Sequence, residues 1–130
     1  MQLNTFFKNA TLSVLLTMSL IVSGCNAERS QAKKLANEFM RSYLSDDTFS
    51  NRHFGKLDST MTITDSVVTQ LRERAESSGL FKTGIPYPDK AVPSTLYYIS
   101  VDYTDCRQEE RHLTFYFTRQ LDDIVAVKGY

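Results

Sequence analysis

The hydrophobic positions of this chain change their period along its length, from a helical repeat to a strand repeat. Between positions 32 and 44 the apolar side chains recur every three or four residues, which is typical of one face of an amphipathic helix. This stripe consists of Ala32, Leu35, Ala36, Phe39, Met40, Tyr43 and Leu44. Charged residues occupy the other side, so the pattern predicts a helix that packs on its own domain, with a membrane-surface or partner-binding helix as the alternative.

A second helix is predicted near the middle of the chain. Its apolar stripe has the same spacing and consists of Val67, Val68, Leu71 and Ala75. Thr64 or Asp65 can cap its first turn, and Gly79 can end it. Before this helix, residues 45–63 mix polar and scattered apolar side chains and predict an ordered connection. After it, residues 79–93 hold all three prolines of the chain and predict an extended loop.

The carboxyl-terminal third alternates with period two, as half-buried strands do. One face of the first strand carries Tyr97, Ile99, Val101 and Tyr103, and one face of the second carries Leu113, Phe115 and Phe117. A loop at residues 105–109 would set the pairing, although a register moved by two residues would keep the same faces. The resulting pairs are Val101 with Leu113, Ile99 with Phe115, and Tyr97 with Phe117. A third run, residues 124–127, would place Val125 opposite Phe117 and Val127 opposite Phe115, which completes a three-stranded antiparallel meander.

Two helices followed by a meander predict an α+β domain. We expect the two amino-terminal helices to pack on one face of a curved antiparallel sheet built around the carboxyl-terminal meander. Residues 31–130 would form a single domain, because a segment of this length suits one hydrophobic core.

The first residues of the chain have a different character. Lys8 precedes a short apolar run, residues 11–22, that several Ser and Thr side chains interrupt. This run fits the core of a secretory signal better than a membrane-spanning helix, which needs about 20 apolar residues. After it come Ser23, Gly24 and Cys25, a pattern that resembles the lipobox of bacterial lipoproteins. The alternatives are an ordinary secretory signal with a fortuitous cysteine, or an uncleaved helix.

The resemblance to a lipobox implies how the chain is processed and where it is held. Residues 1–24 would be a signal peptide that is removed, Cys25 would carry the lipid, and residues 25–30 would be the lipidated tether. Two or more acyl chains bind a membrane stably. Asn26 is not the aspartate that resembles an inner-membrane retention signal, so in a bacterium with two membranes we expect the outer membrane, facing the periplasm.

Charge and cysteine content narrow the classes of partner. Fifteen basic residues balance fifteen acidic ones, so nothing favours nucleic acid as a partner. The membrane, through Cys25, is the expected partner, together with an envelope protein as a further candidate.

If Cys25 is acylated, Cys106 is the remaining one of two cysteines and has no partner for a disulfide within the chain. We expect Cys106 to be an inert loop thiol, with pairing to another molecule as the alternative.

The order of elements and the closing residues 125–130 together carry a second resemblance. This closing stretch reads Val-Ala-Val-Lys-Gly-Tyr. It resembles the terminal strand of small bacterial lipoproteins with a cystatin-like or nuclear-transport-factor-like α+β roll. The resemblance implies a cone-shaped sheet with room for a pocket between sheet and helices, used in different relatives for binding, assembly or catalysis.

Two groups of residues are candidates for contact with a ligand or partner. On the face of the meander opposite the core, the predicted register makes Asp102 and His112 cross-strand neighbours, with Tyr98 and Tyr116 further along; a plain surface charge pair is the alternative reading of Asp102 and His112. The predicted pocket between sheet and helices would be lined by Tyr43, Tyr97, Tyr103 and Phe117.

No catalytic motif, metal site or cofactor is predicted. The chain has no Gly-rich phosphate loop and no nucleophile elbow, and its two histidines, His53 and His112, do not form a recognisable ligand pattern. The expected function is a non-enzymatic binding or assembly protein of the cell envelope. A small-molecule binder or enzyme that uses the pocket is the alternative, and a structural or stress-response lipoprotein without a specific ligand is a third.

Overall fold

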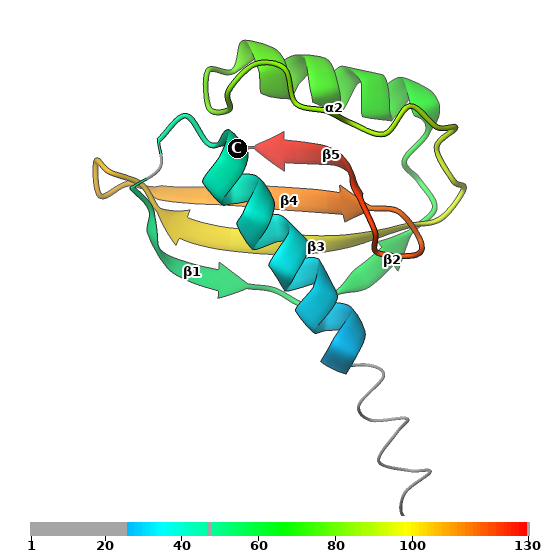
Figure 1. Cartoon of the computed structure of the whole chain (residues 1–130), viewed down its shortest axis with the longest axis horizontal. Helices are drawn as coiled ribbons and strands as arrows, with labels where there is room; N and C mark the ends of the chain where they lie inside the picture. The colour runs from blue at the N-terminus through cyan, green and yellow to red at the C-terminus, as the bar shows by residue number, and fades with distance from the viewer. Residues whose placement is uncertain (1–25, 47, 130) are drawn as a thin grey trace, which may run out of the picture. The chain divides into compact units, whose positions relative to one another are not determined.

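The computed structural model describes residues 26–46 and 48–129 (Figure 1). Residues 26–43 are helical and are called the first helix below. The other elements are β1 (Ser50–Phe54), β2 (Asp58–Thr60), α2 (Asp65–Ser77), β3 (Leu96–Thr104), β4 (Glu110–Phe117) and β5 (Ile124–Gly129). Two helices and a five-stranded antiparallel sheet make an α+β fold, which confirms the predicted class.

One compact unit, residues 31–130, contains the hydrophobic core. All buried apolar side chains of the described residues lie between Ala32 and Val127, inside this unit. The unit therefore holds a complete core and is expected to fold without the residues that precede it.

The register between β3 and β4 is the predicted one. Val101 pairs with Leu113, Ile99 with Phe115, and Tyr97 with Phe117. Every inward position on one strand thus meets an inward apolar position on the other, and a shift of one residue would turn all of them to the opposite face. Between β4 and β5 the predicted pairing of Val127 with Phe115 is confirmed, whereas the predicted pairing of Val125 with Phe117 is wrong.

A bulge causes this difference. The register shifts between Tyr116 and Phe117, so Phe117 lies opposite Ile124, and Tyr116 lies opposite Ala126. Val125 consequently packs in a cluster on the other side of the sheet instead of beside Phe117.

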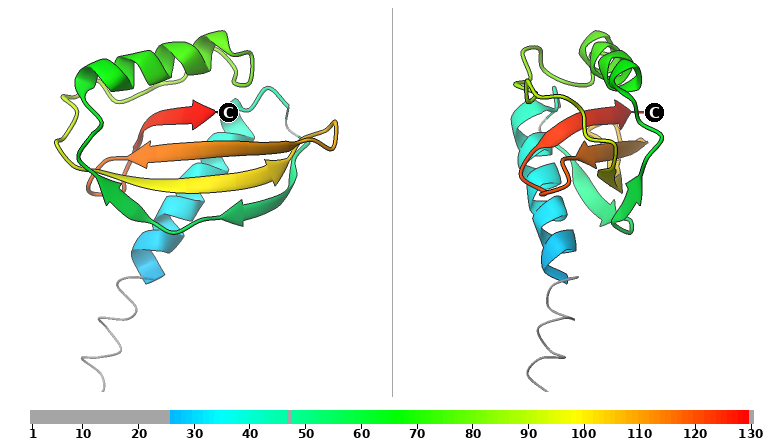
Figure 2. Two further views of the ribbon diagram at one scale, coloured as in Figure 1. Left: turned by 180° about the vertical axis from the view of Figure 1, so that it is seen from behind. Right: turned by 90° about the vertical axis from the view of Figure 1, so that its right-hand side faces the viewer.

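Two short strands that the sequence did not predict complete the sheet. Both β1 and β2 pair with β3, along the edge that β4 does not occupy (Figures 1 and 2). Their sequences are polar and largely exposed, so they lack the alternation that marks a half-buried strand. Asn51 has a positive φ of 54°, and the register shifts between Ser50 and His53. An irregular polar edge strand gives little periodic signal.

The first helix covers one face of the sheet through an aromatic contact network. The ring of Phe39 lies 5.6 Å from that of Phe115 on β4 and 5.8 Å from that of Phe81, in edge-to-face arrangements. Met40 and Leu44 are buried in the same cluster. This helix therefore closes the main core, as its apolar stripe predicts.

The second helix packs mainly on the opposite face, which corrects the prediction that both helices share one face. Val68 and Leu71 of α2 cluster with Tyr116 and Ala126, whereas the neighbouring Phe117 belongs to the main core. Successive residues of a strand point to opposite faces, so the two clusters lie on different sides of the sheet. Figure 2 shows α2 running along the β5 side of the sheet, apart from the first helix.

Local contacts fix the position of α2. Thr64 caps the helix, because its hydroxyl accepts a hydrogen bond of 3.3 Å from the backbone N–H of Val67. Gly79 follows the helix with a φ of 75°, as the sequence predicts for its end. The Arg72 Nε donates to the carbonyl oxygen of Val125 at 2.9 Å and ties α2 to β5.

The predicted signal peptide and Cys25 lie outside the described residues. Among the helices that the structure does describe, none has the length and hydrophobicity needed to cross a membrane.

Candidate ligand cavity

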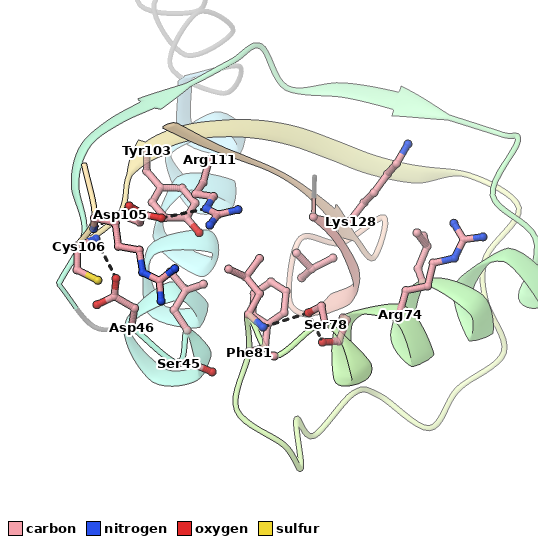
Figure 3. Close-up of a pocket in the computed structure, with 18 residues that line it drawn as sticks. Ser45, Asp46, Arg74, Ser78, Phe81, Tyr103, Asp105, Cys106, Arg111 and Lys128 are labelled. Carbon is pink, nitrogen blue, oxygen red and sulfur yellow. Dashed lines mark hydrogen bonds and ion pairs between the residues drawn. The ribbon is translucent and has the colours of Figure 1, made fainter. Parts of the chain in front are cut away.

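A cavity of about 580 Å³ opens where the end of the first helix, the end of α2, the β3–β4 turn and the last residues of β5 meet (Figure 3). Its walls come from segments far apart in the sequence. The lining residues are Leu44, Ser45, Asp46, Leu71, Arg74, Ala75, Ser78, Gly79, Leu80, Phe81, Tyr103, Asp105, Cys106, Arg107, Arg111, Val127, Lys128 and Gly129.

The apolar part of the lining belongs to the cores. Leu44, Phe81 and Val127 are almost fully buried, and Leu71 and Ala75 of α2 add to them. Backbone hydrogen bonds hold this wall, because Ser45 N donates to Leu80 O at 3.0 Å and Lys82 N donates to Tyr43 O at 2.7 Å. The segment after α2 is thereby fastened against the end of the first helix.

Arg111 and Asp105 form an ion pair on one side of the cavity. The Arg111 Nε donates to Asp105 Oδ2 at 3.0 Å, and a second guanidinium nitrogen lies 3.2 Å from Glu109 Oε2. Asp105 also accepts from the backbone N–H groups of Glu109 and Arg107, each at 2.9 Å. The Glu109 bond, followed by the Arg111 and Arg107 bonds, holds the pKa of Asp105 below its ordinary value although desolvation acts in the opposite direction.

Asp46 and Cys106 form a second polar contact on the same side (Figure 3). The Asp46 carboxylate accepts from the thiol and the backbone N–H of Cys106 and from Thr48, and these bonds hold its pKa well below the ordinary range. The same hydrogen bond raises the pKa of the Cys106 thiol. Cys106 therefore stays protonated at neutral pH, which is unfavourable for a nucleophile.

Two further cations, Arg74 and Arg107, line the cavity. The guanidinium groups of Arg74, on α2, and Arg107, in the β3–β4 turn, form no ion pair and no hydrogen bond with residues that the structure describes. With Arg111 and Lys128, the lining has four cationic side chains against the two carboxylates of Asp46 and Asp105. The cavity is thus positively charged in a chain whose charges balance overall.

Of the four aromatic residues predicted to line a pocket, only Tyr103 lines this cavity. Phe117 is completely buried in the main core, and Tyr97 packs against that core. The ring of Tyr43 lies 4.9 Å from that of Phe39 and borders a separate hollow of about 240 Å³. Side chains fill the space between the first helix and the middle of the sheet, so the cavity lies at the edge of this layer instead.

The structure brings together the four residues that were predicted on the sheet face opposite the core, but they are not uniformly exposed. They are Tyr98, Asp102, His112 and Tyr116. The His112 Nδ1 hydrogen-bonds with Asp102 Oδ1, and the rings of Tyr98 and Tyr116 lie 6.2 Å apart. Tyr98, Tyr116 and His112 share a shallow hollow of about 340 Å³. Tyr116 is only 9% exposed because α2 covers that end of the face, whereas the side chain of Asp102 is 64% exposed.

His53 lies next to this group. It pairs with Asp102 across β1 and β3, so the two histidines of the chain flank the same aspartate. Across the described ranges, 26–46 and 48–129, no three His, Cys, Asp or Glu side chains are grouped in a way that could hold a metal ion.

The sequence pointed to none of the cavity residues other than Tyr103 as a site. Arg74 lies on α2 outside the apolar stripe that the sequence predicts, and Arg107 lies in a turn. Their common cavity depends on where α2 packs, which the periodicity of the helix alone does not determine.

The chain was compared with protein-family models, with curated proteins and with solved structures, and no match was found in any of the three comparisons. The cavity must therefore be interpreted from its own geometry.

Proposed function

We propose that the protein is a non-enzymatic binding protein of the bacterial cell envelope, and that the cavity beside α2 is its ligand site. The observation that carries this proposal is the cavity itself, about 580 Å³ in volume, with an apolar wall and a polar, charged rim. This volume and this mixed lining are those of typical small-molecule sites.

Protonation behaviour favours binding over catalysis at this site. A general base or acid works best with a pKa near the working pH. Here hydrogen bonds lower the pKa values of Asp46 and Asp105 and raise those of Cys106 and Arg111, in each case away from neutrality. Burial likewise raises the pKa of Tyr103. These groups keep one charge state near neutral pH and serve best as fixed hydrogen-bonding partners.

The envelope location rests on the amino-terminal sequence. We propose that Cys25 is acylated after removal of residues 1–24, and that the protein is held at the outer membrane, facing the periplasm.

The likeness to small lipoproteins with a cystatin-like or nuclear-transport-factor-like roll belongs to this proposal. It draws support from the curved antiparallel sheet with the first helix across one face (Figure 1). Fractionation of cells that express the full chain or its Cys25→Ser variant tests the anchor, and recovery of both in the same membrane fraction would refute it.

Crosslinking in living cells tests the ligand site. A photoreactive aliphatic residue replaces Leu80, which lines the cavity, and in a control strain it replaces Met61, which is 75% exposed and lies outside the cavity. After irradiation we expect the position-80 protein to gain a small-molecule mass that the position-61 protein lacks. A protein-sized adduct at position 61, with nothing at position 80, would instead indicate an assembly module with another contact surface.

A further inference from the structure

We propose that the cavity binds an anionic amphiphile, with its apolar chain against the buried wall and its carboxylate or phosphate group at Arg74 or Arg107. The inference rests on the proposed function, because it names the class of ligand for the same cavity. It follows from an apolar wall and two guanidinium groups in one lining, where those groups form no ion pair or hydrogen bond with residues that the structure describes.

The apolar wall can accept a hydrocarbon chain without rearrangement of the core. Leu80 is half-buried at the wall, and behind it Phe81, Leu44 and Val127 are already packed in the main core. Covering this wall removes apolar surface from water, which is the general driving force for binding an acyl or aromatic group.

The distribution of charge favours an anion over a cation. Both lining carboxylates are already occupied by the chain itself: Asp105 accepts from Arg111 and two backbone N–H groups, and Asp46 accepts from Cys106 and Thr48. A cationic ligand would have to compete for these acceptors. The Arg74 and Arg107 guanidinium groups, in contrast, form no ion pair or hydrogen bond within the described part of the chain.

The two arginines come from different walls. Arg74 lies in the last turn of α2, and Arg107 lies in the turn between β3 and β4. In Figure 3, Arg74 and Lys128 lie on one side of Phe81, and Cys106, Asp105 and Arg111 lie on the other. A guanidinium group binds carboxylate and phosphate oxygens through paired N–H donors, so either arginine suits such a headgroup.

Calorimetric titration of the chain without residues 1–25 tests this inference. This form keeps every buried side chain of the described structure, and a cooperative thermal transition is the first control. The probes share one tail and differ in the head: octanoate, octyl phosphate, octanol and octylammonium, with acetate as the head alone. The first two probes distinguish a fatty-acid type of ligand from a phosphate-bearing one.

Variants at exposed positions locate the headgroup. The double variant Arg74→Gln/Arg107→Gln removes both proposed headgroup cations, and Arg119→Gln removes an exposed arginine outside the cavity. We expect octanoate or octyl phosphate to bind wild type and Arg119→Gln with the same affinity. The affinity for the double variant should be lower by a factor of about ten or more. Acetate and octylammonium should bind at least tenfold more weakly than the better anionic probe.

Two results would overturn the inference, and they differ in what they say of the cavity. If octanol or octylammonium binds as tightly as the anionic probes, or the double variant binds them normally, the anionic class is wrong while ligand binding in the cavity stands. If none of the probes binds, the class is wrong as well, and crosslinking at position 80 then decides separately whether the cavity has a ligand of another kind.

Discussion

The carboxylate of Asp46 accepts a hydrogen bond of 2.9 Å from the backbone N–H of Cys106, 60 residues further along the chain. The thiol of Cys106 donates to the same carboxylate. Together these bonds tie the segment after the first helix to the β3–β4 turn at one side of the cavity (Figure 3). The same contact raises the pKa of this exposed thiol.

Replacing Asp46 by Asn should make Cys106 more reactive. The bond to Asp46 is the largest cause of the raised thiol pKa, and Asn cannot supply the negative charge that keeps the thiol protonated. The rate of alkylation by iodoacetamide at neutral pH, followed by mass spectrometry, should rise in Asp46→Asn and remain at the wild-type rate in Asp89→Asn, an exposed control. Equal rates in all three proteins would show that Asp46 does not control the thiol.

The lowered pKa values of Asp46 and Asp105 predict a loss of stability in acid. A carboxyl whose pKa is lower in the folded state stabilises the fold above its unfolded pKa, ordinarily 3.8, and loses this contribution as pH falls through its folded pKa. The urea midpoint should therefore be steady from neutral pH to about pH 4 and fall toward about pH 2. Asp105→Asn should have a lower midpoint at neutral pH and a smaller fall in acid, whereas an acid fall as large as that of wild type would contradict this assignment.

Arg72 should contribute strongly to the position of α2. Its Nε donates to Val125 O at 2.9 Å, and its guanidinium carbon lies 4.7 Å from the centre of the Tyr87 ring. Arg72→Ala should lower the free energy of unfolding by about 2 kcal/mol, since a charged hydrogen bond and a cation–π contact are lost together. Lysine has neither the Nε donor nor the planar group, so Arg72→Lys should recover little of this loss. A loss no larger than that of Arg119→Ala would refute this role.

Phe39 should be among the most costly residues to truncate. Its ring contacts Tyr43, Phe81 and Phe115 and joins the first helix to the sheet. Phe39→Ala should cost about 3–5 kcal/mol of unfolding free energy, whereas Met61→Ala, at a position that is 75% exposed, should change it by less than about 0.5 kcal/mol. Chemical denaturation measures both, and similar small effects would show that the first helix is not part of the core.

The parts of the fold that could be predicted are those with a regular hydrophobic period. The alternation of the two strands places Ile99 and Phe115 on the same core face, and a turn at residues 105–109 selects the register that pairs them. The stripe containing Phe39 likewise determines which side of the first helix is buried. Local periodicity determines the buried face in both cases.

The parts that could not be predicted depend on tertiary packing. The bulge in β5 leaves Val125 as the extra residue opposite Tyr116 and Phe117 and turns it to the other face, and β1 and β2 are polar edge strands held by backbone hydrogen bonds to β3. The face that α2 covers depends on Arg72 and on the fit of Leu71 against Tyr116 and Ala126, not on the helical period. For this reason the pocket predicted from the sequence included Phe117, which is buried, and the cavity beside α2 was not predicted.

The mass of the intact lipidated protein, released gently from its own membrane, tests the central claim most directly. We predict a bound small molecule beyond the mass of the lipidated chain. It should be lost in Leu80→Trp, which places a bulkier side chain at the apolar wall of the cavity, and retained in Met61→Trp, which lies outside it. If wild type and both variants carry only the lipid on Cys25, or all three carry the same bound molecule, the cavity beside α2 is not the ligand site.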